Sequence, residues 1–241
     1  SLALAAERAD ATPVVLKVQY PHRECAHEAE ALRVWDGDGA VRLLAHDPTR
    51  HALLLERCTP GSPLSDRPPG EALEVLIGLL PRLWRRADAS FHRLEEEAAR
   101  WRRHLPERWA EAGRPFERAL LDEALAALEE LPASQPEQVL LHQDLHGGNV
   151  LRAQREPWLV IDPKPLVGER AFAVAPIVRS AELGHEEKAV RRRLAQLARA
   201  LDLDPERARR WALAQTLAWG FDEHGARPRH VEVARWLRPP C

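Results

Sequence analysis

The chain of 241 residues contains no methionine and only three lysines, Lys17, Lys164 and Lys188, beside 32 arginines. A chain that begins at Ser1 and lacks an initiator methionine is typical of a fragment of a longer sequence. The arginine excess, together with abundant alanine, is typical of GC-rich coding and says little about function. Each of the three lysines therefore needs an explanation of its own.

Several other features are scarce, and each absence excludes a class of protein. The three cysteines, Cys25, Cys58 and Cys241, form no C-x-x-C pair, which argues against a zinc site and favours a reducing compartment. The longest uncharged apolar run, residues 171–178, is far shorter than the roughly 20 residues of a membrane-spanning helix. No basic segment followed by an apolar run opens the chain, so no secretion signal is indicated.

The charge balance excludes partners that would be attracted by a strong electrostatic field of the whole protein. The formal net charge is −2, so nothing in it would attract nucleic acid or an anionic membrane. The composition, 45% hydrophobic and 30% charged, is that of an ordinary globular protein. We therefore predict a cytoplasmic protein with neither a nucleic-acid nor a membrane partner.

The first third of the sequence predicts a sheet with one helix. The β-branched run 13–18 is the clearest strand, whereas residues 1–8 show no clear pattern. Helical spacing of apolar residues ends at Asp36-Gly37. Besides 13–18, we expect strands at 41–45 and 51–56 and a helix over 22–35.

The densest proline and glycine stretch, residues 59–70, predicts a lobe boundary. We expect a small nucleotide-binding lobe at 1–58 and a larger, mainly helical lobe at 59–241. The apolar spacing predicts helices at 71–89, 97–112, 115–131, 186–201 and 205–219. Three short strand-like runs interrupt this helical part, at 139–141, 150–151 and 158–161.

The interrupting strands carry the strongest chemical pattern. If residues 150–152 pair with 158–161 as a hairpin, Asn149 and Asp162 face each other at its open end. An amide oxygen and a carboxylate at one point are suited to Mg²⁺, which takes few protein ligands. Asp144, five residues before Asn149, is near enough to accept a proton from a substrate hydroxyl.

A purely structural interpretation also exists for these residues. Asp144 and Asp162 can cap turns, and His142 can be a packed loop histidine, because aspartate and asparagine are common turn residues. Turn chemistry explains any one of these residues taken alone. It does not predict the order of the whole set, with two apolar strands between Asn149 and Asp162.

Lys17 is the second candidate for a site residue. It lies within the apolar run 14–18, where a compact ammonium that reaches phosphate oxygens explains lysine better than arginine. Glu28, on the following helix, can reach back and hold that ammonium. The alternative is an exposed lysine on an edge strand, a common place for this residue.

Together these motifs carry a family resemblance. A strand lysine, a helix glutamate, H-x-D-x-x-x-x-N and a following aspartate resemble the ordered set of protein-kinase-like phosphotransferases. More narrowly, the chain resembles the aminoglycoside/hydroxyurea phosphotransferase family, the streptomycin kinases in particular. Four segments carry this likeness over essentially the whole chain: 27–33, 53–57 before Pro60-Gly61, 141–151, and 161–169 with its Asp-Pro-Lys-Pro stretch.

The resemblance implies an α+β, two-lobed protein-kinase-like fold and MgATP-dependent transfer of a phosphoryl group to a hydroxyl. Asp144 would be the catalytic base. Asn149 and Asp162 would hold Mg²⁺, and Lys17, steadied by Glu28, would contact the α- and β-phosphates of ATP.

The resemblance also implies where adenine and the acceptor bind. The interlobe hinge from Glu56 to Cys58 would meet adenine through its backbone. The acceptor would be a small cationic amino sugar or a similar compound, and Glu169, Asp222 and Glu223 are candidates for an acidic wall around it. Streptomycin, another aminoglycoside and hydroxyurea all suit the proposed base equally well.

The chain departs from the family pattern at two places. Relatives have a first strand and a phosphate-covering loop before the lysine strand, but only sixteen residues precede Lys17 and the first glycine is Gly37. We therefore expect a small lobe that lacks its first strand. Ala173 stands where the family has an aspartate that supports the catalytic loop, which questions the rigidity of that loop.

Two other functions stay open at this point. One is a metal-dependent hydrolase, with zinc or manganese held by His142, Asp144, His146 and Asp162; such an enzyme would not need the pair of Lys17 and Glu28. The other is a kinase-like binding protein that has lost turnover, which the short N-terminal part and Ala173 would explain.

Overall fold

A computed structural model describes residues 1–87 and 90–239, and in it the chain forms two compact units. Unit 1 comprises Ser1–Phe91 and Leu140–Leu166, and unit 2 comprises His92–Val139 and Val167–Cys241. This division differs from the predicted boundary after residue 58, because the first helix beyond that boundary is bonded to the helix before it, and segment 140–166 is bonded to residues 39–41 and 61–62.

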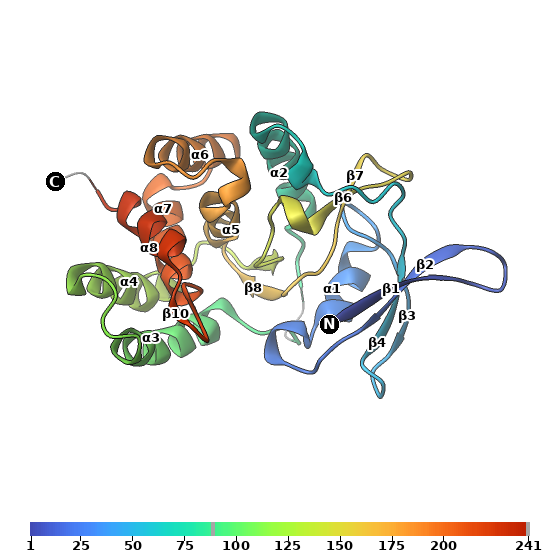
Figure 1. Cartoon of the computed structure of the whole chain (residues 1–241), viewed down its shortest axis with the longest axis horizontal. Helices are drawn as coiled ribbons and strands as arrows, with labels where there is room; N and C mark the ends of the chain where they lie inside the picture. Colours follow the sequence, from blue (N-terminus) through green and yellow to red (C-terminus); the bar gives the residue numbers. More distant parts are fainter. Residues whose placement is uncertain (88–89, 240–241) are drawn as a thin grey trace. The chain divides into compact units, whose positions relative to one another are not determined.

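Unit 1 contains a four-stranded antiparallel sheet in the order β1-β2-β4-β3 (Figure 1). Lys17 lies opposite Ala3 on one neighbouring strand and Leu53 on the other. The three predicted strands are present, and residues 1–8 supply a further one that periodicity did not reveal, since Leu2 and Leu4 are exposed. The strands are β1 (Leu2–Glu7), β2 (Pro13–Val18), β3 (Leu43–Asp47) and β4 (Ala52–Glu56).

Unit 1 also contains two helices. The predicted helix over 22–35 is a 3₁₀ turn, Arg23–Cys25, followed by α1 (Glu28–Trp35). Asp36 ends α1 in the left-handed conformation, with φ of 46°. The second helix, α2 (Pro69–Leu83), is shorter than predicted, and Ala89 lies outside the described residues. The indole Nε1 of Trp35 donates to the Leu83 carbonyl at 2.9 Å, which ties α1 to α2.

The rest of unit 1 holds the predicted hairpin. It follows β5 (Val139–Leu141) and consists of β6 (Val150–Arg152) and β7 (Trp158–Val160), with Val150 opposite Val160. Backbone hydrogen bonds join β6 to residues 61–62 and β7 to residues 39–41. The hairpin is therefore bonded on both sides to segments that adjoin the N-terminal sheet.

Unit 2 is mainly helical and is built around α7. Most residues of α7 are buried, and the Asp204 carboxylate caps the helix by accepting from the backbone N–H groups of Glu206 and Arg207. Trp211 meets Phe172 edge to face with ring centroids 5.2 Å apart. The elements are α3 (Leu94–Glu111), α4 (Arg118–Glu130), α5 (Ala175–Arg179), α6 (Glu187–Ala200), α7 (Pro205–Ala218) and α8 (Pro228–Trp236), with the short strands β8 (Leu166–Gly168), β9 (Phe221–Asp222) and β10 (Gly225–Ala226).

The helices at 97–112, 115–131, 186–201 and 205–219 are confirmed with small shifts of their ends. Neither α5 nor α8 was predicted: α5 has only five residues and α8 only nine. Across residues 1–87 and 90–239, none of the helices combines the length and the apolar character needed to cross a bilayer. Cys241, named among the cysteines, lies outside the described residues.

Candidate active site

Three of the predicted site residues meet in unit 1 at the ammonium of Lys17. Its Nζ lies 2.6 Å from each carboxylate oxygen of Glu28 and 2.5 Å from Oδ1 of Asp162. The amide of Gln19 also donates to Glu28, at 2.7 Å. Lys17 and Glu28 are buried, with Glu28 only 1% exposed, so the alternative of an exposed edge-strand lysine is wrong.

The cluster keeps its charges through mutual contact. Burial lowers the pKa of Lys17, but Glu28 and Asp162 outweigh it and hold that pKa above the ordinary lysine value. Burial raises the pKa of Asp162, but the Lys17 ammonium outweighs it and keeps the carboxyl pKa low. For Glu28 burial is the stronger effect, and its pKa is raised despite Lys17. The Lys17 ammonium is therefore needed to offset the repulsion between the neighbouring carboxylates of Glu28 and Asp162.

Asp144 and Asn149 belong to the loop between β5 and β6. The side-chain amide of Asn149 donates from Nδ2 to the Asp144 carbonyl at 2.9 Å, and its backbone N–H donates to the His146 carbonyl at 2.9 Å. Gln143 has a φ of 66°, which turns the chain sharply just before Asp144. The Asp144 carboxylate is only 13% exposed and forms an ion pair with Lys164.

The hairpin brings Asn149 and Asp162 to its open end, but Asn149 lies opposite Ile161 and not opposite Asp162, one position away from the predicted register. The backbone N–H of Ile161 donates to the Asn149 carbonyl at 2.9 Å, so the pairing continues one step beyond the strands. Asp162 then adopts a left-handed φ of 55°, and its side chain is 42% exposed. The Nδ2 atom of Asn149 is engaged with the loop, which directs the amide oxygen elsewhere. A carboxylate that solvent reaches and an amide oxygen on a residue at the same end of the hairpin are ligand types that Mg²⁺ prefers.

His142 is buried and supports the loop that carries Asp144. Its Nε2 lies 2.9 Å from the Ile161 carbonyl, and its Nδ1 lies 3.3 Å from the backbone N–H of Asp144. A proton on Nε2 satisfies both contacts, so the imidazole is neutral. Burial lowers its pKa from 6.5 to about 4. Its ring stacks on Trp35 at 6.2 Å between centroids, which holds the loop on α1.

This burial predicts a pH-dependent stability. Between about pH 6.5 and 4 the unfolded chain binds a proton at His142 that the folded chain does not, so the free energy of unfolding falls as the pH drops. The loss attributable to His142 is about 3 kcal/mol. Urea unfolding of the wild type and of His142→Gln at several pH values measures it. Parallel pH dependences of the two proteins would contradict this account.

Comparison with known proteins shows where this chain belongs. The family model described as "Aminoglycoside/hydroxyurea antibiotic resistance kinase" matches residues 1–224. This chain is a member of that family. It is 44% identical over 253 residues to a hydroxyurea phosphotransferase of Kitasatospora aureofaciens, with 98% of this chain and 71% of that one covered. It is 38% identical over 250 residues to a streptomycin 6-kinase of Streptomyces glaucescens, with 99% and 81% covered.

The fold agrees with this membership. A thermostable mutant of the aminoglycoside phosphotransferase APH(4)-Ia, solved in a ternary complex with AMP-PNP and hygromycin B, matches with a TM-score of 0.59 at 16% identity, covering 97% of this chain and 93% of that one. The predicted α+β, protein-kinase-like fold is confirmed. The chain is a small-molecule phosphotransferase of the antibiotic resistance kinase family.

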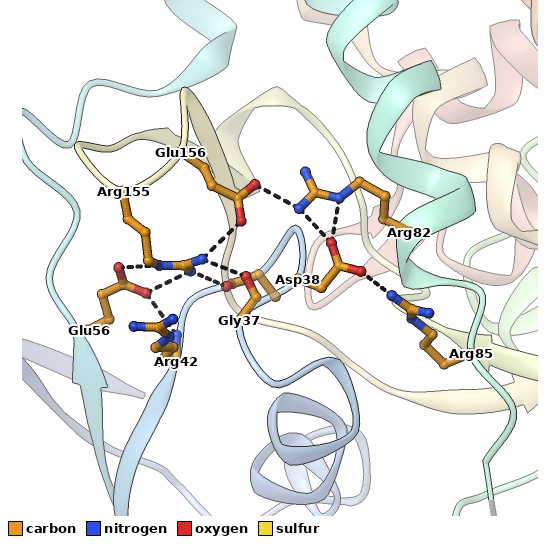
Figure 2. A network of polar contacts seen from close by, with 9 residues as sticks. Gly37, Asp38, Arg42, Glu56, Arg82, Arg85, Arg155 and Glu156 are labelled. Carbon is orange, nitrogen blue, oxygen red and sulfur yellow. Dashed lines mark hydrogen bonds and ion pairs between the residues drawn. The ribbon is translucent and has the colours of Figure 1, made fainter.

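The end of β4, predicted as the hinge of this kinase, is held by one arginine from the hairpin turn. Figure 2 shows Arg155 between three segments of unit 1. Its Nε and Nη2 donate to the two carboxylate oxygens of Glu56, both at 2.9 Å, while Nη1 and Nη2 also donate to the carbonyls of Gly37 and Ala40. Nη1 further contacts the Glu156 carboxylate at 2.9 Å. All five N–H bonds of this guanidinium are engaged.

The same network continues to α2. Glu156 accepts from Arg82 at 2.7 Å, and Arg82 also donates to Asp38, which in addition contacts Arg85 (Figure 2). The predicted hinge residue Glu56 is thus part of an ion-pair chain: burial raises its pKa, but Arg155 outweighs burial and lowers it. Cys58 is buried, and burial raises the pKa of its thiol to about 11. An adenine contact at Glu56 to Cys58 stays a prediction.

The three carboxylates predicted around the acceptor lie in unit 2, in different settings. Glu169 is fully buried, where Arg207 donates twice to it, at 2.6 and 2.8 Å, and Trp211 donates at 2.6 Å. It therefore anchors α7 inside the unit. Asp222 accepts from the backbone of His224 and from Arg227, and Glu223 is exposed. Of the three, only Asp222 and Glu223 lie where a solute reaches them.

The hydrolase alternative is not favoured. Both ring nitrogens of His142 face backbone groups, and Nδ1 of His146 accepts from the Gly148 N–H at 3.1 Å. Within residues 1–87 and 90–239 no three histidine, cysteine, aspartate or glutamate side chains are grouped as a metal-binding set. The lysine and glutamate pair that a hydrolase does not need is the best-connected part of the site.

Sequence reasoning missed two members of this site. No sequence pattern points to Arg155 or to the partner of Lys164. Both contacts join residues far apart in the chain: Arg155 and Glu56 are 99 positions apart, and Lys164 and Asp144 are 20. Of these two residues, only Lys164 could have been found from the sequence, because lysine is scarce in this chain.

Proposed function

We propose that this kinase transfers the γ-phosphoryl group of MgATP to a hydroxyl of a cationic, aminoglycoside-like small molecule. The observation that carries the proposal is the arrangement inside unit 1, where Lys17, Glu28 and Asp162 are in contact and Asp144 lies on the adjoining loop. Family membership supports the reaction class. The chemistry of these side chains supports the choice of nucleotide and metal.

In the proposed reaction the acceptor oxygen forms a bond to the γ-phosphorus as the bond to the bridging oxygen of ADP breaks. ADP leaves with the electron pair of that bond. Asp144 accepts the proton that the acceptor hydroxyl loses, and Lys17 neutralises charge on the α- and β-phosphates. Catalysis of this kind depends mostly on positioning and charge neutralisation.

Asn149 and Asp162 would hold Mg²⁺. When bound, the ion supplies positive charge that offsets the negative charge of the phosphates. Asp162 suits this role because its side chain is 42% exposed and already faces the lysine of the site. Asn149 suits it because its amide nitrogen is fixed by the loop carbonyl.

The choice of acceptors to test follows from the relatives. A streptomycin 6-kinase and a hydroxyurea phosphotransferase match almost the whole chain, so streptomycin and hydroxyurea come first. Hygromycin B, present in the complex of a structural neighbour, is the third. Asp222 and Glu223 are proposed to attract the cationic groups of an amino sugar.

A coupled assay of ADP release tests the function. Streptomycin, hydroxyurea and hygromycin B are each offered with ATP, with and without Mg²⁺, and mass spectrometry identifies the phosphorylated product. We expect Mg²⁺-dependent product with at least one of them. MgATP is also expected to raise the melting temperature of the protein, because a ligand that binds the folded state stabilises it. A protein that binds no nucleotide and forms no product would contradict the proposal.

A further inference from the structure

Lys164 lies beside the proposed base in unit 1. In a chain with three lysines, it lies two positions after Asp162, between Pro163 and Pro165, and its ammonium forms an ion pair with the Asp144 carboxylate. Both prolines are buried, and the Lys164 backbone N–H donates to the His142 carbonyl at 3.0 Å. Its backbone is thus fixed on both sides, and any movement of the ammonium comes from rotation of the side chain.

The ammonium of Lys164 contacts the proposed base, and the residue lies close to the proposed metal ligand in the chain. It forms an ion pair with the Asp144 carboxylate, and only Pro163 separates Lys164 from Asp162. The Lys164 side chain is 23% exposed and that of Asp144 is 13% exposed, so the pair is only partly screened by water.

That position is where the transferred group must pass. Asp144 can take a proton only from a hydroxyl in contact with it, and the oxygen of that hydroxyl is the atom that attacks phosphorus. A cation paired with Asp144 is then within reach of the phosphoryl oxygens. A compact ammonium on a flexible stem can exchange a carboxylate partner for a phosphate oxygen, which a rigid guanidinium fork does less readily.

We propose that Lys164 is a second active-site lysine that binds the γ-phosphoryl group and holds Asp144 before that group arrives. This inference rests on the proposed function. During transfer the P–O bond to ADP breaks, the P–O bond to the acceptor forms, and the hydroxyl proton goes to Asp144, which the lysine has released. Lys164 contributes positive charge to the transferred oxygens throughout.

Nucleotide titration calorimetry tests the contact without any turnover. The measured quantity is the ratio of the affinities for Mg-AMP-PNP and MgADP, which isolates the γ-position. The comparison is made between Asp144→Asn and the double variant Asp144→Asn with Lys164→Met. In the Asp144→Asn background, removal of Lys164 leaves no unpaired carboxylate at position 144. The double variant therefore neither loses stability through a buried charge nor repels the γ-phosphate. We expect the double variant to lose about tenfold in the ratio, with MgADP affinity unchanged.

Lys188→Met is the matched control, because Lys188 is the third lysine of the chain and is exposed on α6 in unit 2. We expect its affinity ratio and its kcat to equal those of the wild type. Lys164→Met in the wild-type background should lower kcat by about 10²–10³-fold, the usual cost of losing one group that stabilises transition-state charge.

The outcomes separate the two proposals. An unchanged affinity ratio in the double variant overturns the role of Lys164 even if the wild type is an active kinase. A wild type that binds neither nucleotide refutes the proposed function itself.

Discussion

Replacing Asp144 with asparagine is expected to lower kcat by about 10²–10⁴-fold, the usual contribution of a positioned general base. Asparagine keeps the shape of the side chain and cannot accept the proton of the acceptor hydroxyl. The contacts of the Asp144 backbone, to Asn149 and to His142, stay in place, and the ion pair of its side chain with Lys164 loses its negative partner. The loss should therefore appear in kcat and leave the KM for ATP nearly unchanged.

Steady-state kinetics with the best acceptor measures this effect, with product followed by ADP release. Asp122→Asn is a suitable control, because Asp122 is exposed on α4 in unit 2, whereas the residues proposed for catalysis belong to unit 1. We expect its kcat to match the wild type. An Asp144→Asn protein that phosphorylates the acceptor as fast as the wild type would show that the base is another group.

Lys17→Met is expected to give the largest loss of stability, about 3–5 kcal/mol in the free energy of unfolding. Removal of the ammonium leaves Glu28, which is 1% exposed, and the neighbouring Asp162 without their shared cation. Gln19 still donates to Glu28, but as a neutral amide it does not replace the lost charge. The same variant should lose the stabilisation by MgATP, because the proposed contact to the phosphates is gone.

Urea denaturation at neutral pH measures the loss. The double variant Lys17→Met with Glu28→Gln should recover much of it, since the buried carboxylate is removed along with its partner. Lys188→Met, an exposed lysine changed in the same way, should stay within about 0.5 kcal/mol of the wild type. If Lys17→Met and Lys188→Met proved equally stable, the buried cluster would have no structural importance.

The parts of the site that follow local order were predictable. Two short apolar strands between Asn149 and Asp162 imply a hairpin, and a hairpin brings its two ends together whatever the rest of the fold does. Lys17 was singled out because a charged residue inside an apolar run needs a partner, and Glu28 is that partner. In both cases the residues lie close in the chain, since Lys17 and Glu28 are 11 positions apart and Asn149 and Asp162 are 13.

The parts that depend on long side chains from distant segments were not predictable. Glu169 stands in a family motif and was interpreted as a residue of the acceptor pocket, but Arg207, 38 positions away, reaches it in the interior of unit 2. The division into units also depends on contacts between distant segments. Hydrogen bonds from residues 39–41 and 61–62 to the hairpin attach residues 140–166 to the N-terminal part. No spacing in the sequence encodes these contacts.

The preference of this chain for arginine over lysine has one consequence at the turn of the hairpin. Arg155 serves five oxygens: both of Glu56, one of Glu156 and the carbonyls of Gly37 and Ala40. A lysine there, with three N–H bonds, would leave at least two of these oxygens unserved. If the mutational bias that favours arginine were reversed, arginines on the neighbouring surface would be replaced by lysine before Arg155. At position 155 selection for these contacts would retain arginine.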